Sequence, residues 1–534
     1  MPSPELPSRV MSSPSDGAPI PVLIVGAGPT GLVLALWLTA LGVRVRIIDT
    51  TAGPGTTSRA LAVQARTLEL YEQLGIASEV IQEGVRIRAL NLWVSGKRAA
   101  RVELANMGEG VTPFSFALAF PQDAHERLLV AQLEARGVLV ERRTELLHFE
   151  QRPDAIDVRL RAADGTEERC TATWLAGCDG AHSAVRHGIG VDYAGGTYSE
   201  LFYVADLSAS GPTVNEEIHL DLDEADFLAM FPLARDNHVR VVGSVTAGAA
   251  QRGDDITFAD IDTRLVDGLG LAISKVNWFS SYRVHHRVAS KFRVGRAFLL
   301  GDAAHIHSPA GGQGMNTGIG DAINLAWKLA AVIGGRAPAS MLDTYETERI
   351  GFARKVVSTT DRVFTFVTKQ GAIARFARTR LVPRIAPALF RTAAVRRFIF
   401  RTVSQMGIEY RGSALSSGAA RDVHGGDRLP WVPLATGGDN YAPLRSMAWQ
   451  AHVYGTASTA LSAHCAGLQL PLHTFEWTPA MHSAGLARGA LYLIRPDSYL
   501  ALVDATANPS TLSTYFESLG LSATDVARAP DTPR

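Results

Sequence analysis

The strongest constraint on the fold is a glycine-rich turn that joins an apolar strand to an apolar helix near the N-terminus. Residues 21–25 (PVLIV) have the unbroken aliphatic pattern of a buried parallel strand, and the sequence GAGPTG follows directly at 26–31. A helical pattern then runs to about Leu41, and a second strand over 43–48 ends in Asp49. This order of strand, turn, helix and strand predicts a parallel α/β sheet.

Each glycine of this turn has its own physical role. Gly26 permits the tight turn, Gly28 lets a pyrophosphate approach the backbone, and Gly31 lets the helix pack closely on the strand. Asp49 stands at the spacing expected of an acid that holds an adenosine ribose. The motif therefore predicts binding of the ADP half of a dinucleotide, and by itself it suits FAD and NAD equally.

A second glycine-rich segment lies far along the chain. A strand-like run at 297–300 leads into GDAAH at 301–305, a glycine-rich turn follows, and an apolar helical pattern begins at about Asn316. The carboxylate of Asp302 can accept hydrogen bonds from a polyol, while N–H groups at the helix start favour an electron-rich ring edge. A flavin offers both a ribityl chain and such an edge.

A third motif, DGAHSAVR at 179–186, stands between these two segments. Asp179 and Gly180 are expected to form a turn at the end of a strand, with Ser183 and Arg186 on the short helix that follows. Alone, this stretch would be interpreted as an Asp-Gly turn beside an exposed arginine. The order of the three motifs is far more specific, and a simple NAD dehydrogenase would leave the second and third motifs unexplained.

Taken in order, the motifs resemble those of class A FAD-dependent aromatic monooxygenases with the p-hydroxybenzoate hydroxylase fold. The pattern is most similar to phenol-type members: pentachlorophenol monooxygenase, the hydroxyphenylpropionate hydroxylases and the aromatic polyketide hydroxylases. The resemblance is dense over 22–360 and looser beyond. It implies non-covalent FAD, NADPH or NADH as co-substrate, and O2. It also implies hydroxylation of a phenolic or polyketide-type aromatic substrate through a flavin C4a-hydroperoxide.

The same resemblance implies roles for particular residues. The GAGPTG motif would bind the ADP part of FAD, the DGAHSAVR motif at 179–186 would touch FAD and the nicotinamide cofactor, and Asp302 would hold the ribityl chain. Arg59 is expected near the flavin and the substrate mouth, and Gln122 near the ribityl or phosphate region; their alternatives are a surface arginine and a loop amide. The implied catalytic residues are Arg59 and Pro309, the latter at the position where oxygen adds. The last three of the implied cofactor-binding residues would act through backbone N–H groups. These residues are Gly26, Gly28, Gly31, Asp49, Arg59, Gln122, Asp179, Gly180, Asp302, Gly314, Met315 and Asn316.

The group that activates a phenol is left open. Imidazole titrates in a suitable range, and four histidines lie in or near the flavin motifs. His305 belongs to the GDAAH pattern and is expected to serve the loop. The other three candidates are His285, His286 and His307. No spacing predicts a metal site.

The motif positions predict a discontinuous FAD-binding domain over 21–190 and 283–404, after a disordered leader at 1–20. Short alternating runs over 191–282 predict an inserted antiparallel β-sheet substrate domain, which part of 90–120 would join. Phe227, Met230 and Phe231 would line its pocket or fill its core. The remainder, 405–534, resembles the thioredoxin-like C-terminal domain of phenol-type members through Arg-Pro-Asp-Ser-Tyr at 495–499, without a CxxC pair.

Composition narrows the class further. The chain of 534 residues has 52 Lys and Arg against 52 Asp and Glu, so we expect neither nucleic acid nor a membrane as a partner. The arginines of 378–401 are interpreted as solvated helix faces. Three cysteines and the lack of a long apolar run favour a cytoplasmic enzyme, monomeric or homodimeric, with a small aromatic substrate. The remaining alternatives are a flavin-dependent reductase or oxidase and a non-catalytic flavin-binding protein.

Overall fold

A parallel sheet forms the centre of the molecule. The computed structural model describes residues 19–55, 60–222, 227–233, 237–245, 256–308, 311–368 and 376–521. The sheet runs in the order β17-β18-β11-β1-β2-β8, with β17 antiparallel to β18 and with β9 and β10 as an antiparallel extension from β11. Its strands are β1 (Ile20–Val25), β2 (Val45–Asp49), β8 (Val140–Arg142), β9 (Glu145–Gln151), β10 (Ile156–Arg161), β11 (Glu167–Gly177), β17 (Arg293–Val294) and β18 (Ala297–Leu299).

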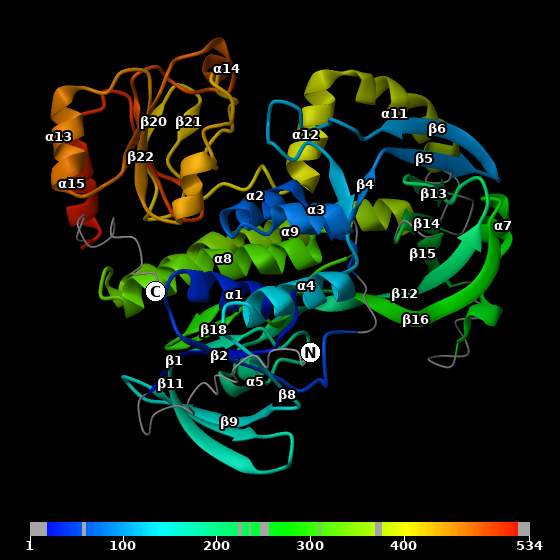
Figure 1. Cartoon of the computed structure of the whole chain (residues 1–534). Helices are drawn as coiled ribbons and strands as arrows, with labels where there is room; N and C mark the ends of the chain where they lie inside the picture. Colours follow the sequence, from blue (N-terminus) through cyan, green and yellow to red (C-terminus); the bar gives the residue numbers. More distant parts are fainter. Residues whose placement is uncertain are drawn as a thin grey trace, which may run out of the picture.

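Two apolar helices cover this sheet, α1 (Pro29–Ala40) and α8 (Gly314–Ile333), and they pack side by side (Figure 1). Their close approach depends on small residues. A Cβ added at Gly318 would lie 2.3 Å from the hydroxyl oxygen of Thr30, so only glycine fits there. The helices thus bring the N-terminal motif and the GDAAH segment, nearly 300 residues apart, to one place.

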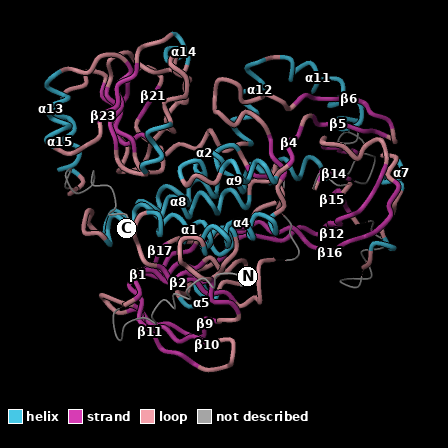
Figure 2. Tube along the Cα trace, in the orientation of Figure 1, coloured by secondary structure: helices cyan, strands magenta, loops and turns pink. Residues whose placement is uncertain are grey.

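A second, curved sheet extends from the parallel one, as the long strands in Figure 2 show. Its order is β19-β16-β12-β15-β14-β13-β5-β6, and all neighbours are antiparallel except β13 and β5. The strands are β5 (Ala89–Val94), β6 (Lys97–Glu103), β12 (Tyr193–Ser210), β13 (Ile218–Leu222), β14 (Phe227–Pro232), β15 (His238–Ser244), β16 (Ala272–Ala289) and β19 (His305–Ile306). Segment 89–103 therefore joins strands from 193–289; where one domain ends and the next begins stays a prediction.

The two faces of this sheet have different partners. One face carries Leu201, Met230 and Val241 and packs under α7 (Arg264–Gly268) and the residues around it. The opposite face carries Ile218 and Phe231, which pack on a small sheet of β3 (Ala62–Val63), β7 (Ala117–Ala119) and β4 (Val85–Ile87). Because this second face packs on the small sheet that contains β3, we call it the inner face.

Helices follow α8 and connect to the C-terminal part. They are α9 (Asp343–Thr368), a π-helical turn η5 (Ala377–Leu381), α11 (Val382–Arg391) and α12 (Ala393–Val403). Helix α11 packs on β6 at the outer edge of the molecule (Figure 1). Earlier in the chain, the helices around the parallel sheet are α2 (Ala65–Gln73), α3 (Ala77–Glu83), α4 (Gln122–Glu134) and α5 (Ala184–Gly188).

The C-terminal part has its own six-stranded mixed sheet, in the order β21-β20-β25-β24-β22-β23. A parallel β22–α13–β23 unit precedes the antiparallel pair β24 and β25. The elements are β20 (Ser417–Ala420), β21 (Val423–His424), β22 (Gln450–Tyr454), α13 (Thr459–Gly467), β23 (Leu472–Phe475), α14 (Pro479–Ser483), β24 (Leu491–Ile494), β25 (Leu500–Asp504) and α15 (Pro509–Ser518). The thioredoxin-like assignment stays a prediction.

The Arg-Pro-Asp-Ser-Tyr segment at 495–499 joins this part to helices α8 and α9. Arg495 donates to both carboxylate oxygens of Glu348 on α9, at 2.7 and 3.1 Å, and Lys328 on α8 donates to the same carboxylate at 2.8 Å. All three side chains are fully buried. Although burial opposes its charge, Arg495 and Lys328 hold the pKa of Glu348 well below its ordinary value. The segment singled out from sequence is thus the buried joint between the two parts.

Candidate active site

The N-terminal glycine motif has the predicted geometry. Gly26 adopts φ +102°, and a Cβ there would lie 2.3 Å from the carbonyl oxygen of Cys178; a Cβ on Gly31 would lie 2.0 Å from the oxygen of Gly26. A Cβ on Gly28 would meet nothing within 4 Å. Helix α1 starts at this point without a side-chain cap or an acid in its first turn. Open space beside uncapped helical N–H groups is what a pyrophosphate requires.

Asp49 lies at the end of β2 and holds the glycine loop. Its carboxylate accepts hydrogen bonds from the backbone N–H of Ala27 at 2.6 Å and of Thr51 at 2.7 Å. Beside it, at the end of β8, Arg142 has its Nη1 atom 3.8 Å from Asp49. The Nη2 atom of Arg142 is buried and has no hydrogen-bond partner in the described structure. A buried guanidinium donor of this kind suits an acceptor on a bound ligand. Sequence reasoning missed Arg142, because nothing before folding places β8 next to β2.

The DGAHSAVR motif braces the GDAAH loop. Asp179 caps α5 by accepting from the Ser183 hydroxyl at 2.6 Å and the Val185 N–H at 3.1 Å, and burial raises the pKa of this carboxyl. Arg186 donates to the carbonyl oxygen of Ala303 at 3.1 Å. Gly180, with φ +74°, forms the turn between them. The motif arginine is therefore buried and structural, and the second and third motifs are one assembly.

Asp302 is exposed at the tip of that loop. Its own carbonyl oxygen accepts a hydrogen bond from Tyr193 at 2.7 Å, and the preceding Gly301 N–H donates to Asp321 at 3.0 Å. The backbone on both sides of Asp302 is thus fixed, while its carboxylate faces outward. This is the geometry expected of an acid that binds a polyol ligand.

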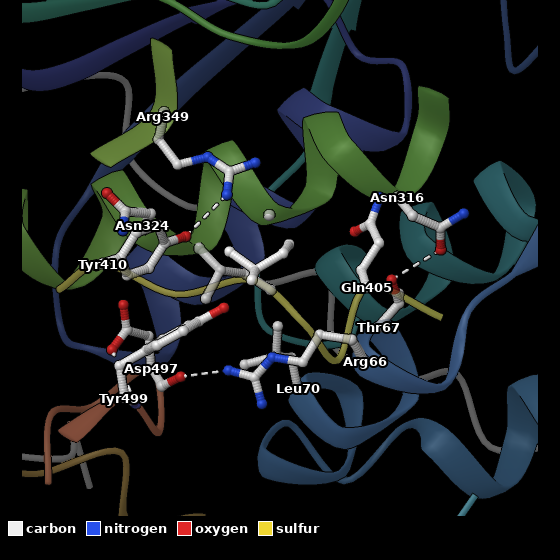
Figure 3. A pocket seen from close by; sticks show the side chains of 13 residues that line it. Arg66, Thr67, Leu70, Asn316, Asn324, Arg349, Gln405, Tyr410, Asp497 and Tyr499 are labelled. Carbon is white, nitrogen blue, oxygen red and sulfur yellow. Dashed lines mark hydrogen bonds between the residues drawn. The ribbon is translucent and has the colours of Figure 1, made fainter. Parts of the chain in front are cut away.

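The first turn of α8 is held by the side chain of Asn316. Its Oδ1 accepts from the Thr67 hydroxyl at 2.8 Å (Figure 3) and from the Gln64 N–H at 2.9 Å. Its Nδ2 donates to the oxygens of Ala62 and Gly312. The sequence prediction gave Asn316 only a backbone role. Because α8 has no side-chain cap, the N–H groups of its first turn remain available to an electron-rich ligand edge.

A buried ion network supports the same turn from behind. Asp321 accepts from His305 Nε2 at 2.7 Å and from Arg349 Nε at 2.6 Å. Arg349 also donates to the hydroxyl oxygen of Tyr410 (Figure 3) and to the carbonyl oxygen of Thr317. Although burial would raise the pKa of Asp321, Arg349 and His305 lower it. A cavity of about 20 Å³, the size of one water molecule, adjoins Arg349. His305 therefore serves the loop, as expected.

Three other predicted positions have different outcomes. Gln122, the first residue of α4, donates from its backbone to Ala60 at 3.2 Å and from its side chain to Glu126 at 2.8 Å, so it borders the segment that follows Arg59. Arg59 itself and Pro309 lie outside the described residues. Their assigned roles stay predictions.

The three other histidines differ in surroundings. His285 is exposed and shares a hydrogen bond with Thr197 at 2.7 Å. His286 Nδ1 lies 3.8 Å from a carboxylate oxygen of Asp361 on α9. His307 bonds through Nδ1 to the carbonyl oxygen of Ser308 at 2.8 Å, and burial lowers its pKa to about 4. Since a carbonyl can only accept, Nδ1 of His307 carries the proton. No one histidine is singled out as the base.

The buried side chains of the inner face are apolar apart from Arg240, which pairs with the half-buried Asp206. Side chains alternate along strands, and Phe227 and Phe231 belong to this face, whereas Met230 is fully buried in the core on the other side. Arg240 binds Asp206 through two hydrogen bonds of 2.7 and 2.8 Å. Among the described strands of this sheet, Arg240 is the one lysine or arginine with a buried side chain.

These features fit FAD better than a bare dinucleotide. The open Gly28 and the start of α1 would hold the pyrophosphate, Asp49 and Arg142 lie where the adenosine half would end, and Asp302 would bind the ribityl chain. The start of α8 would face the ring. NAD has no ribityl group and would leave the exposed Asp302 loop without a function.

Comparison with known proteins agrees with this geometry. A family model described as an FAD binding domain matches residues 19–360. The 6-methylpretetramide 4-monooxygenase of Streptomyces rimosus is 33% identical over 533 residues, covering 95% of this chain and 94% of that protein. Pentachlorophenol 4-monooxygenase of Sphingobium chlorophenolicum is 33% identical over 431 residues, covering 80% and 78%.

A solved structure extends the likeness to the whole fold. The anhydrotetracycline hydroxylase OxyS from Streptomyces rimosus superposes with a TM-score of 0.75 at 27% identity, covering 93% of this chain and 98% of that one. The C-terminal part is thus included in the match. None of the described helices has the length and apolar character needed to cross a bilayer. By motifs, site geometry and similarity, the chain belongs to the FAD-binding family of flavin-dependent aromatic monooxygenases.

Proposed function

We propose that this monooxygenase hydroxylates an uncharged phenolic ring of the polycyclic, polyketide type, with electrons from NADPH or NADH. One atom of O2 enters the ring and the other leaves as water, so that one nicotinamide is oxidised for each hydroxyl formed. Bound FAD supplies the activation of O2 and the transfer of the oxygen atom. The protein's own residues bind and orient the two reactants and exclude water.

The proposed substrate class rests on the ion pair between Arg240 and Asp206. A carboxylated aromatic substrate needs a cation to replace its hydration. On the described strands above the site, the one buried cation already has a carboxylate in a two-point hydrogen bond. The remaining buried side chains of the inner face, such as Phe202 and Val204, are apolar. This face therefore favours a neutral ring over a carboxylated one.

The proposal of a polycyclic ring rests on how much of this chain each relative matches. The relative that acts on 6-methylpretetramide matches over 95% of this chain, whereas pentachlorophenol 4-monooxygenase matches over 80% at the same identity. A monocyclic phenol is therefore the second candidate, favoured by the latter relative. We propose a homodimer or monomer in the cytoplasm as the working state of the enzyme.

Water exclusion explains the need for a closed apolar face over the flavin. In a wet site the reduced oxygen species would be lost as H2O2 before it reached the ring. We propose that Pro309 shapes the oxygen site and that Arg59 borders the substrate mouth. Pro309→Gly is expected to raise H2O2 release per nicotinamide oxidised, with FAD content unchanged. Unchanged coupling would remove the assignment of Pro309.

The test measures NADPH and NADH oxidation by the FAD-loaded enzyme against three sets of compounds: polycyclic phenols and quinones, monocyclic phenols, and hydroxybenzoates. H2O2 and incorporation of 18O from 18O2 are followed in parallel. We expect stimulated oxidation with labelled product for the polycyclic set and none for the carboxylated set. Strong turnover of hydroxybenzoates would contradict the proposal, and stimulation without label would indicate a reductase or oxidase.

A variant tests the reasoning directly. Asp206→Asn leaves the buried Arg240 without its counter-ion, so a carboxylated phenol is expected to bind better than it does in the wild type. The control is Asp262→Asn, which removes a carboxylate paired with Arg264 on the exposed side. If both variants bind a carboxylated phenol equally well relative to an uncharged phenol, Arg240 does not face the substrate.

A further inference from the structure

The charge of the whole chain is balanced, but one segment of it is strongly cationic. Residues 376–403 contain seven arginines and no aspartate or glutamate, and the nearest acids in sequence are Asp361 and Glu409. The arginines are Arg378, Arg380, Arg384, Arg391, Arg396, Arg397 and Arg401. This segment forms η5, α11 and α12, and we call it the 376–403 patch.

Exposed apolar side chains gather on the same patch. The described part of the chain has eight large apolar residues with strongly exposed side chains, and six of them lie in the 376–403 patch. They are Phe376, Leu381, Ile385, Leu389, Phe398 and Val403. Scattered exposed leucines are ordinary, but a contiguous group marks an interaction surface.

The helical arrangement makes the group a stripe. Leu381 at the end of η5 and Ile385 and Leu389 in α11 recur every four residues, so they lie on one side of the helical segment, where they are 47%, 42% and 49% exposed. Exposed Arg384 and Arg391 run beside this stripe at a spacing of seven. The helix therefore presents parallel apolar and cationic stripes to its surroundings.

Helix α12 continues the surface. Phe398 is 70% exposed, with Arg397 and Arg401 exposed next to it. On its other side, Phe400 is buried against Met107 and Met406, which anchors the helix to the molecule. The apolar side chains of α12 are therefore divided between the core and the outside.

We propose that the 376–403 patch docks the enzyme on an anionic phospholipid surface, with both helices lying in the plane of the interface. The exposed aliphatic and aromatic side chains would enter the boundary of the acyl chains, and the arginines would meet lipid phosphates. The patch lies at the outer edge of the molecule (Figure 1). Such binding needs no membrane-spanning helix, and it is independent of the proposed substrate. It departs from the expectation of no membrane partner, because that expectation used the net charge of the whole chain and not the charge of this segment.

Charge decides between lipid and a second copy of the chain. A two-fold contact through this patch would set arginines against arginines, with no acid within the patch to balance them. An anionic bilayer carries the complementary charge. It is also fluid, so it can accommodate apolar residues spread along two helices without a matching rigid surface. An acidic protein partner is the competing outcome that the experiment separates.

The test is flotation of the FAD-loaded, full-length enzyme with vesicles of phosphatidylcholine alone or mixed with phosphatidylglycerol. Wild type is expected to float only with phosphatidylglycerol and to be released by high salt. The triple variant R384Q/R391Q/R397Q should bind about a hundredfold more weakly, since each arginine near the surface contributes roughly tenfold or less. The variant L381Q/I385Q/L389Q keeps all seven arginines of the patch and should nevertheless lose binding even at low salt.

Matched controls separate a local site from general charge. R88Q/R152Q/R159Q removes three exposed arginines elsewhere and should keep its binding. FAD content and NADPH oxidation should be unchanged in every variant. Absence of flotation, or an equal loss in the control, would overturn the proposal; in the first case an acidic protein becomes the better partner. A dimer in light scattering that L381Q/I385Q/L389Q dissociates would assign the patch to a second copy instead.

Discussion

Replacement of Asp321 by asparagine tests whether the buried network holds the candidate site. Asp321 is fully buried and accepts hydrogen bonds from three donors: Arg349 Nε, His305 Nε2 and the backbone N–H of Gly301. An asparagine keeps one acceptor oxygen and adds an NH2 group. In either orientation that NH2 group faces a donor, and the Arg349 charge loses its counter-ion.

The expected cost follows from burial. Removing one partner of a buried ion pair costs about 3–5 kcal/mol, because the other charge remains buried. We therefore expect Asp321→Asn to lower the free energy of unfolding by about that amount. The control is Asp343→Asn, which breaks the pair with Arg293 at 2.7 Å; Asp343 is 72% exposed. An exposed pair contributes only about 0–1 kcal/mol.

Urea unfolding of both variants, followed by tryptophan fluorescence with and without FAD, measures this difference. Asp321→Asn should also weaken FAD binding, because Asp321 fixes the backbone next to Asp302. If Asp321→Asn costs no more than Asp343→Asn, the network does not support the fold, and the argument from buried charge is refuted. A large loss of stability with unchanged FAD affinity would separate the fold from the site.

Other predictions follow from single contacts. Gly28→Ala should fold normally, because its Cβ enters open space, but that space is where the pyrophosphate would lie, so FAD should bind more weakly. Gly31→Ala should fail to fold, because its Cβ would lie 2.0 Å from the Gly26 oxygen. Soluble yield and flavin content distinguish the two variants. Asp302→Ala should release FAD while the unfolding midpoint of the flavin-free protein stays unchanged, and full flavin retention would disprove the ribityl role. Burial lowers the pKa of His125 from 6.5 to about 3, so between these pH values the unfolded chain binds a proton that the folded chain does not bind. The free energy of unfolding therefore falls as the pH drops from 6.5 toward 3. In His125→Phe the urea midpoint should change less between about pH 7.5 and 5 than it does in the wild type.

The sequence by itself determined the local architecture of the motifs. Strand, glycine turn and helix are encoded by neighbouring residues, so GAGPTG at 26–31 and GDAAH at 301–305 could be placed on their elements before folding. Backbone roles were equally predictable, because Gly26 and Gly31 are required by φ and by close approach within short segments. Family and cofactor followed from the order of the motifs.

Only the tertiary structure decided which side chains complete the site. Asn316 binds Gln64 across 252 positions, and Arg142 comes beside Asp49 because β8 pairs with β2. Such contacts depend on how helices and strands pack, and no local pattern records them. The periodic spacing of apolar residues shows which side of a helix or strand is buried, but it does not identify the element that packs against that side. For the same reason the sequence could not assign Met230 to the core and Phe231 to the inner face, because strand register made that choice.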